Sequence, residues 1–169
     1  MKAVKFLSVV VLGLFLATTV HAKDLKIAYV DLARIFDNYQ KTKEYDAVLQ
    51  KEAMAYQKQR NDMVSKIRDA QGKLAVLKAD EKQKLQADVD KQTTDLFDFD
   101  KQKRTELTQK HDDKVKEILL EIQKIVSDIA KKGDYTFILN DRVLMYAEPT
   151  SNITEQVLKT LNDSYPGKK

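Results

Sequence analysis

Few side chains in this chain could carry out chemistry. The sequence has no cysteine to act as a nucleophile or zinc ligand, and its only histidines are His21 and His111. His111 is followed by Asp112 and Asp113 in a charged stretch, where an imidazole is ordinarily solvated. None of the four glycines belongs to a glycine-rich loop that could bind phosphate. The sequence therefore predicts a protein that is not an enzyme and uses no cofactor or nucleotide.

Two acidic tripeptides could suggest a calcium site. Asp88-Val89-Asp90 and Asp98-Phe99-Asp100 both begin like a calcium-binding loop. Neither is followed by the turn glycine and the later oxygen ligands that such a loop requires. We interpret both as helix surface and predict no metal site.

The first 22 residues resemble a signal peptide. Lys2 and Lys5 precede an apolar run from Phe6 to Ala17, and Val20-His21-Ala22 resembles a small-x-small cleavage site. The apolar run is short for a membrane-spanning helix, although an uncleaved anchor is the alternative. Because there is no cysteine to carry a lipid, we expect cleavage after Ala22 and a soluble exported product.

The composition favours long helices over a compact globule. One third of the residues are charged, and the chain has four glycines, two prolines and no tryptophan. Loss of Lys2 and Lys5 with the signal peptide would lower the formal net charge from +4 to +2. A balance this close to neutral argues against nucleic acid as a partner.

Two apolar stripes predict two helices. From Leu32 to Leu77 the apolar residues recur with a spacing near 3.5, after Asp31 as a helix cap. A second stripe runs from about Asp80 to Lys132 and stops at Gly133.

The polar segment from Lys78 to Glu81 predicts a reversal between the stripes, giving an antiparallel hairpin. This hairpin would place Leu74 near Leu85, Met63 near Leu96 and Leu49 near Lys110. One continuous helix through Asp80, paired with a second copy, is the alternative. Polar residues interrupt both stripes and would bend the arm or fix its register; they are Thr42, Asp46, Arg60, Lys103, Lys110 and His111.

The remaining segments predict a small β body. Lys26–Val30, Tyr135–Leu139 and Val143–Ala147 have the composition of three strands. A capping box of Asn152 and Glu155 would begin a closing helix. The apolar face of this helix would consist of Val157, Leu158 and Leu161.

The predicted fold is therefore α+β and mostly α: a long antiparallel helical hairpin on a three-stranded body. Residues 1–22 are the signal peptide, residues 32–132 the arm, and residues 23–31 with 133–169 the body. A sheet this small with exposed edges favours a closed homo-oligomer. Its candidate contact residues are Ile27, Tyr29, Phe137, Leu139 and Met145.

Both ends of this arrangement carry a family resemblance. The segments Lys26-Ile27-Ala28-Tyr29-Val30-Asp31-Leu32-Ala33-Arg34-Ile35-Phe36, Ala130–Tyr135 and Ile153–Leu158 resemble the Skp (OmpH-like) family of periplasmic chaperones. The resemblance implies a periplasmic homotrimer whose three helical arms enclose a cavity. It also implies that unfolded outer-membrane β-barrel proteins are held there without ATP and delivered to the outer-membrane assembly machinery.

Residues off the seam are candidates for contact with such clients. An unfolded outer-membrane strand alternates apolar and polar residues, so a suitable surface offers scattered apolar contacts and mild positive charge. The candidates are Phe36, Val48, Met54, Val64, Val76, Phe97, Lys58, Lys66, Arg68, Lys73, Lys101 and Arg104. For each one, ordinary solvated surface is the alternative.

Two other functions remain open. A non-catalytic spacer or tether in the cell envelope would use the same long arm, but would need an anchor that the mature sequence does not show. A binder of anionic lipid or nucleic acid is the other. Acidic residues interleaved with the basic ones argue against the continuous basic stripe that it would need, although a lipid surface stays among the candidate partners.

Overall fold

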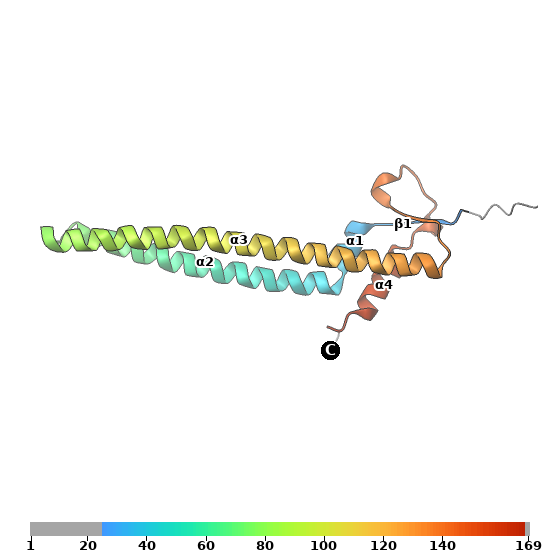
Figure 1. The fold of residues 1–169 in the computed structure, drawn as a ribbon, viewed down its shortest axis with the longest axis horizontal. Coiled ribbons are helices and arrows are strands. Elements are labelled where there is room, and N and C mark those ends of the chain that lie inside the picture. Colours follow the sequence, from blue (N-terminus) through green and yellow to red (C-terminus); the bar gives the residue numbers. More distant parts are fainter. Residues whose placement is uncertain (1–24, 168–169) are drawn as a thin grey trace, which may run out of the picture.

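Two long helices that lie side by side form most of the molecule, and a small body sits at one end of them (Figure 1). The computed structural model describes residues 25–167, so the proposed signal peptide lies outside the described residues. In chain order the elements are β1 (Ile27–Val30), α1 (Leu32–Asn38), α2 (Gln40–Leu74), α3 (Ala79–Lys132), β2 (Phe137–Asn140) and α4 (Thr154–Ser164), with two 3₁₀ turns, Asp141–Val143 and Pro149–Ser151.

The ends of α3 match its sequence signals. Asp80 and Glu81 lie in the first turn and Lys131 and Lys132 in the last, the order that the helix dipole favours. Gly133 caps the helix, and its N–H donates to the carbonyl of Ile129 at 2.9 Å. A Cβ on Gly133 would lie 2.6 Å from the Tyr135 ring, so this position needs glycine for close packing.

The hairpin and its predicted register are confirmed. Leu74 and Leu85 pack against the same cluster near the tip, and Leu49 and Lys110 line the same cleft near the base. The reversal, however, is at Ala75–Lys78 and not at Lys78–Glu81, because α3 already begins at Ala79. One continuous helix through Asp80 is therefore wrong.

The first predicted helix is broken. Asp31 caps α1 as expected, its Oδ1 accepting from the Arg34 N–H at 2.8 Å. The stretch from Leu32 to Leu77 is nevertheless two helices, because Tyr39 adopts an extended conformation with φ −66° and ψ 128°. No glycine or proline marks this break in the sequence, and tertiary contacts described below hold it.

The sheet has two strands and not the predicted three. β1 and β2 pair in parallel, Ile27 opposite Phe137 and Val30 opposite Asn140, so the entire arm is the connection between them. The second edge of β1 is taken by the segment before α4, with Tyr29 bridging Asn152. The chain after β2 enters a 3₁₀ turn, and Val143–Ala147 forms no strand in the described structure.

The body and the lower arm share one core, here called the base cluster. Its buried residues are Ala28, Val30, Ile35, Tyr39, Ile118, Ile122, Ile129, Ile153, Val157 and Leu161. α4 contributes Val157 and Leu161, as predicted, while Leu158 is partly buried. A second, smaller tip cluster consists of Ile67, Ala70 and Val89, with Leu74, Leu85 and Leu96 packed around it.

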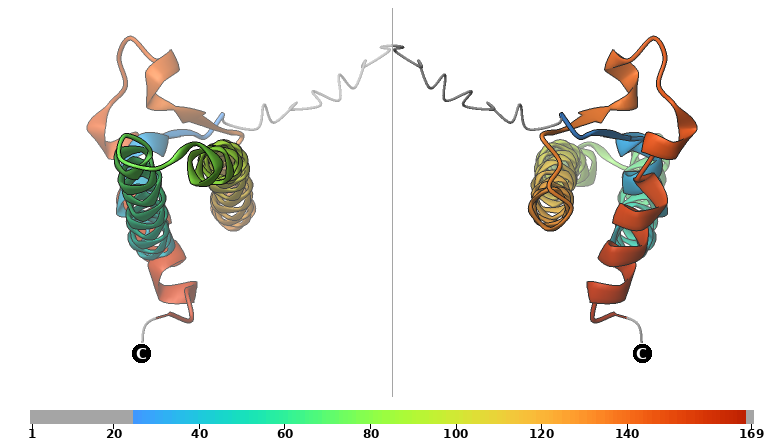
Figure 2. Two further views of the ribbon diagram at one scale, coloured as in Figure 1. Left: turned by 90° about the vertical axis from the view of Figure 1, so that its left-hand side faces the viewer. Right: turned by 90° about the vertical axis from the view of Figure 1, so that its right-hand side faces the viewer.

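The predicted capping box at α4 does not form, because Ile153 and not Asn152 is the N-cap residue and the Asn152 N–H donates to Pro149 O. Asn152 Oδ1 accepts from the Thr154 N–H at 2.9 Å. Glu155 does not reach back to Asn152, because its carboxylate pairs with Arg34 of α1 at 2.6 Å. α4 lies beside the column of α2 when the arm is seen end-on (Figure 2).

Candidate functional site

The arm carries isolated apolar side chains on its surface. Val48, Met54, Val76 and Phe97 are exposed, and Val76 at the tip keeps 84% of its surface open to solvent. Val64 is partly buried. Phe36 lies in α1, packed at the edge of the base cluster, so it belongs to the lower end of the arm.

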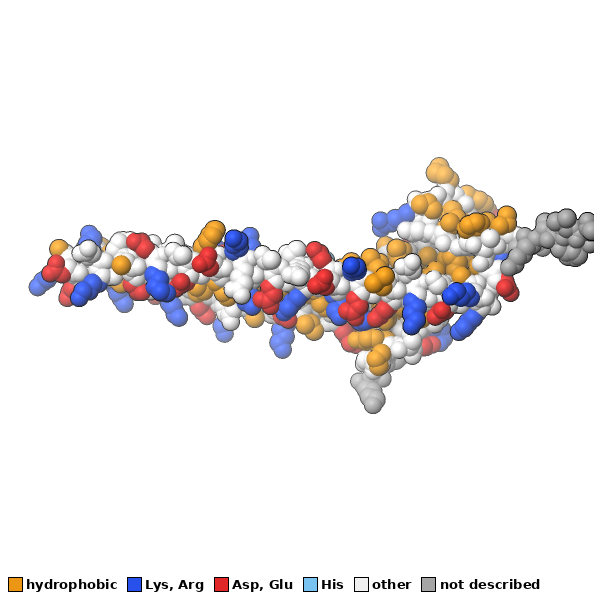
Figure 3. Space-filling model, in the orientation of Figure 1, with side chains coloured by type: hydrophobic (Ala, Val, Ile, Leu, Met, Phe, Trp, Pro, Cys, Tyr) orange, Lys and Arg blue, Asp and Glu red, His pale blue; other side chains and the backbone are white. Residues whose placement is uncertain are grey.

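Most of the candidate basic residues are unpaired. Lys58, Lys66, Arg68, Lys73 and Lys101 are exposed, and their charged groups have no hydrogen bond or ion pair to any residue that the structure describes. Arg104 differs, because its Nε donates to the hydroxyl of Tyr56 at 3.4 Å. Charges of both signs are interspersed along the visible face of the arm, with a few scattered apolar groups among them (Figure 3).

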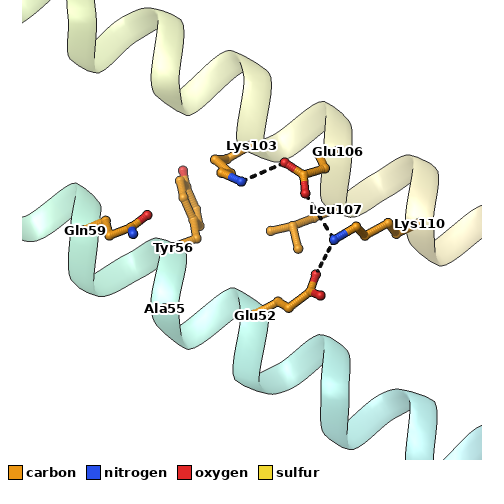
Figure 4. A pocket seen from close by; sticks show the side chains of 8 residues that line it. All are labelled: Glu52, Ala55, Tyr56, Gln59, Lys103, Glu106, Leu107 and Lys110. Carbon is orange, nitrogen blue, oxygen red and sulfur yellow. Dashed lines mark hydrogen bonds and ion pairs between the residues drawn. The ribbon is translucent and has the colours of Figure 1, made fainter.

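Between the two clusters the arm helices are joined by polar contacts. Lys110 Nζ lies 2.9 Å from Glu52 Oε2 across the hairpin and 3.1 Å from Glu106 Oε1 on its own helix. Lys103 pairs with Glu106 at 2.7 Å, and these hydrogen bonds, first from Lys103 and then from Lys110, lower the pKa of Glu106. The side chains surround an open cleft of about 250 Å³ (Figure 4).

A second polar contact lies nearer the tip. Arg60 Nε donates to Asp100 Oδ2 and the Tyr56 hydroxyl donates to Asp100 Oδ1, both at 3.0 Å. Partial burial alone would raise the pKa of Asp100, but the hydrogen bonds from Arg60 and Tyr56 outweigh it and lower the pKa. The Tyr56 ring also packs on Phe99, with centroids 5.8 Å apart.

The predicted polar seam residues therefore divide into three groups. Arg60, Lys103 and Lys110 form the ion pairs just described. We use the name mid-shaft contacts for these pairs and for the Tyr56 hydrogen bond beside them; the partner residues are Glu52, Tyr56, Asp100 and Glu106. Thr42 is buried, whereas Asp46 and His111 are exposed. The last two were assigned to the seam by spacing alone.

A polar joint connects α2 to α3 at the base. Tyr39 donates to Glu121 at 3.0 Å, and Lys41 pairs with Glu117 and Glu121. Burial, together with the hydrogen bond to Glu121, raises the pKa of Tyr39 to about 12. No local sequence signal predicted this joint, since its members are more than 70 positions apart.

The body exposes a set of apolar side chains, here called the body patch. Three of the predicted contact residues belong to it, namely Ile27, Phe137 and Met145; Tyr29 and Leu139 are partly buried. Leu25, Val143 and Tyr146 are also exposed, and they complete the patch. The prediction missed Val143 and Tyr146, although both lie in the apolar segment that it assigned to a third strand.

A shallow apolar groove lies between α1 and α3. It has a volume of about 290 Å³, and Leu32, Phe36, Val115 and Leu119 supply its walls, with Asn140 and Arg142 at the end nearest the sheet. Leu119 and the neighbouring Leu120 are exposed. Sequence spacing placed Val115 on the seam and did not predict a groove.

The described residues contain neither a metal-binding cluster nor a membrane-spanning helix. Residues 25–167 hold no group of three or more histidine, cysteine or acidic side chains that could bind a metal ion. In the same range, no helix is long and apolar enough to cross a membrane.

The fold and these surfaces define a class of protein with a helical-hairpin arm on a small β body. Residues 26–161 match the family described as Outer membrane protein (OmpH-like), and the chain belongs to this family. It is 30% identical to the chaperone protein Skp of Yersinia enterocolitica over 163 residues, covering 92% of this chain and 97% of that protein. It is 29% identical to the chaperone protein Skp of Pectobacterium atrosepticum, with the same coverage.

A solved structure supports the fold. The chain is similar to the crystal structure of an OmpH-like protein from Caulobacter crescentus CB15, with a TM-score of 0.76 and 12% sequence identity. The likeness covers 83% of this chain and 86% of the other. The resemblance predicted from the end segments is therefore confirmed.

Proposed function

We propose that this protein is a periplasmic holding chaperone that binds unfolded outer-membrane proteins without ATP and prevents their aggregation. The observation that carries the proposal is the arm itself. It extends far from the base cluster, and its surface presents scattered apolar side chains and unpaired basic ones. The relatives named as Skp chaperones support the same function.

The physical character of this surface fits an unfolded client better than a folded one. Val48, Met54 and Phe97 are exposed and have charged residues between them in the sequence, so no single deep pocket selects one ligand. An unfolded β-barrel segment with alternating apolar residues can make several weak contacts of this kind at once. The sum of many weak contacts holds the client without trapping it.

The body patch supports a homo-oligomer, which we propose to be a trimer. An exposed apolar patch of this kind on a small domain is typical of a protein interface. The groove between α1 and α3 offers a second apolar surface close to it. In such an assembly the body, residues 23–31 and 133–169, would hold the arms, residues 32–132, around a common space.

The proposed site of action requires export. We propose that residues 1–22 are a signal peptide cleaved after Ala22. The mass of the protein recovered from the periplasm tests this, because a chain that still begins at Met1 would contradict it.

Aggregation suppression tests the chaperone function. A urea-unfolded outer-membrane β-barrel is diluted into buffer without nucleotide, with or without the purified protein, and light scattering is followed. Suppressed scattering at a molar excess of oligomer is the expected result. The double variant Met54→Ser/Phe97→Ser should suppress less, whereas the matched control Gln102→Ser/Gln109→Ser, at exposed polar positions of the same arm, should behave as the parent. Unchanged scattering with the parent would contradict the chaperone function.

Sedimentation equilibrium tests the oligomer. The parent should have three times the mass of the chain. Phe137→Asp/Met145→Asp places two charges in the body patch and should lower the mass to that of a monomer. The exposed control Thr150→Asp should keep the parent's mass. A monomeric parent would contradict the trimer.

A further inference from the structure

The break between α1 and α2 is one residue wide and is not encoded locally. Tyr39 still donates its N–H to Ile35 O at 2.9 Å, and its carbonyl already accepts from the Lys43 N–H at 3.2 Å. The backbone is therefore helical up to Tyr39 and again after it. Between Asp31 and Gly72 the sequence has no glycine or proline, the usual causes of a sharp kink.

The C-terminal helix supplies what the local sequence lacks. Tyr39 has no side chain that caps α2, and the first free amide, that of Gln40, donates instead to Asn162 Oδ1 of α4 at 2.8 Å. This is a helix cap provided from 122 positions away. Without it, the amide would be left to solvent or to a rejoined helix.

Tyr165, just after α4, makes two more contacts with the same junction. Its hydroxyl donates to Glu44 Oε2, in the first turns of α2, at 2.8 Å. Its ring meets the ring of Tyr39 edge-on, with centroids 5.8 Å apart and planes at 74°. Tyr165 thus contacts the break itself and the first turns of α2.

The broken form also leaves a polar atom unsatisfied. Thr42 is 2% exposed, and its Oγ1 has no hydrogen-bond partner among the described residues. In a continuous helix a threonine hydroxyl can donate to the carbonyl four residues earlier, here that of Asn38. A single continuous helix across Tyr39 would therefore give the Thr42 hydroxyl a partner that the broken form does not provide.

At its other end, α4 is attached to the sheet. The Ile153 N–H donates to Tyr29 O at 3.0 Å, and the Asp31 N–H donates to Thr154 Oγ1 at 2.9 Å. α4 consequently connects β1 in the body directly to the start of α2 in the arm. Figure 1 shows the resulting geometry, with α1 set at an angle to α2 and α4 beside them.

We propose that α4 is a latch that sets the direction of the arm. Its residues Asn162 and Tyr165 hold the helix break at Tyr39, and their release allows α1 and α2 to rejoin, which swings α2 relative to the body. Asn162 and Tyr165 are positioning residues, since they act on the arm through Gln40 and Glu44.

Arm direction can be measured with site-specific labels because the chain has no cysteine. Spin labels on Ala79→Cys at the tip and Thr150→Cys in the body report the distance between them. Diluting labelled chains with unlabelled ones leaves only distances within one chain. No client protein is present, so the result is independent of the aggregation assay that tests the proposed function.

The variant Asn162→Ala/Tyr165→Phe should broaden the tip-to-body distances or add a second population. Exchange of the Gln40 amide should become about fivefold faster, as for loss of a helix cap. Asn162→Asp keeps an acceptor oxygen and should behave as the parent. Lys159→Ala, which removes only an exposed contact within α4 to Asp163, is the matched control and should also match it.

A further substitution distinguishes rejoining of α1 and α2 from a nonspecific loss of order in the double variant. Adding Gln40→Pro to the double variant removes the amide that Asn162 bonds and forbids a helix across Tyr39, while proline is well tolerated at a first helical position. A single narrow distance population should return. Distances that stay as in the parent when Asn162 and Tyr165 are changed, or broad distances that Gln40→Pro does not narrow, would overturn the latch.

Discussion

The two ends of the arm are held by apolar clusters of very different size. The base cluster combines β1, α1, α3, α4 and their connections, and five of its side chains, Ile35, Ile118, Ile122, Val157 and Leu161, are essentially inaccessible to solvent. The tip cluster has three buried residues from α2 and α3 alone. Each fully buried aliphatic side chain stabilises a fold by about 1.5–3 kcal/mol, so most of the stability resides at the base.

The difference indicates that one helical hairpin can be rigid at one end and loosely held at the other. Between the clusters the described helices are joined by the mid-shaft contacts and by the Tyr56 ring on Phe99, and partly exposed ion pairs contribute little stability. For the proposed chaperone function, such an arm would accept clients of different shapes, since its free end could adapt while its base stayed folded. Substitutions in the three regions should therefore have unequal effects.

The largest effect is expected at the base. Ile118→Ala removes a fully buried side chain where α3 passes the body, and it should lower the free energy of unfolding by about 2–5 kcal/mol. Urea denaturation followed by circular dichroism measures this. Ile118→Val, the conservative control, should cost only about 0.5–1.5 kcal/mol. If both variants lost the same free energy of unfolding, the cavity left by the removed atoms would not be the cause of the loss.

The tip should be more tolerant. Ile67→Ala truncates a tip residue that is still 9% exposed, and a loss of about 2 kcal/mol or less is expected, because the open surroundings can relax. The loss should be local, with faster amide exchange in residues 63–96 and unchanged exchange in the base cluster. Faster exchange throughout the base would contradict the separation of the two regions.

The joint at Tyr39 should have an intermediate effect that depends on pH. Tyr39→Phe removes the hydrogen bond to Glu121 and should cost about 1 kcal/mol at neutral pH. Because folding raises the pKa of Tyr39 from 10.0 to about 12, its contribution is fully present below pH 10 and is lost as the pH rises through about 12.

Unfolding free energies of parent and Tyr39→Phe, compared across this alkaline range, measure that contribution. Other tyrosines ionise in both proteins, so only the difference between the two reports on Tyr39. The advantage of the parent should shrink as the pH rises. If the difference in unfolding free energy stayed constant with pH, folding would not raise the pKa of Tyr39.

The elements set by local signals were predictable from the sequence. The long stretch without proline, the spacing of apolar residues and the stop at Gly133 gave both arm helices and their register. Asp31 was likewise identified as a cap from its place before the first stripe. These features depend on residues that are neighbours in the chain or repeat regularly along it.

The features that were missed depend on distant partners. The break at Tyr39 is held by Asn162 and Tyr165, and no local signal marks it. The predicted third strand at Val143–Ala147 has suitable composition, but the second edge of β1 is occupied by Asn152. The client candidates were chosen as off-seam residues, which correctly selected exposed positions such as Met54 but also Phe36, whose burial against the body depends on α1.

The smallest effect is expected in the mid-shaft. Folding lowers the pKa of Asp100 from the ordinary 3.8, so the stabilisation from its hydrogen bonds to Arg60 and Tyr56 of the other helix is present at neutral pH and is lost as the pH falls through the lowered value. Spin labels on Gln59→Cys and Gln102→Cys, on opposite helices of the arm, report the distance between the helices. The distribution of this distance should be broader in acid. It should also be broader in 1 M salt, where the Debye length is about 3 Å and ion pairs are screened.

Asp100→Asn should reproduce part of this broadening at pH 7, because it leaves Arg60 without a charged partner. In this variant, lowering the pH should cause less additional broadening of the distances than in the parent, since the Asp100 carboxylate can no longer take up a proton. Asp90→Asn, at an exposed carboxylate that bonds only Gln86 of its own helix, is the matched control. If the distances between the labels respond to acid in both variants as they do in the parent, the mid-shaft contacts do not hold the helices together. The apolar contacts between the helices would then determine how far the arm can open.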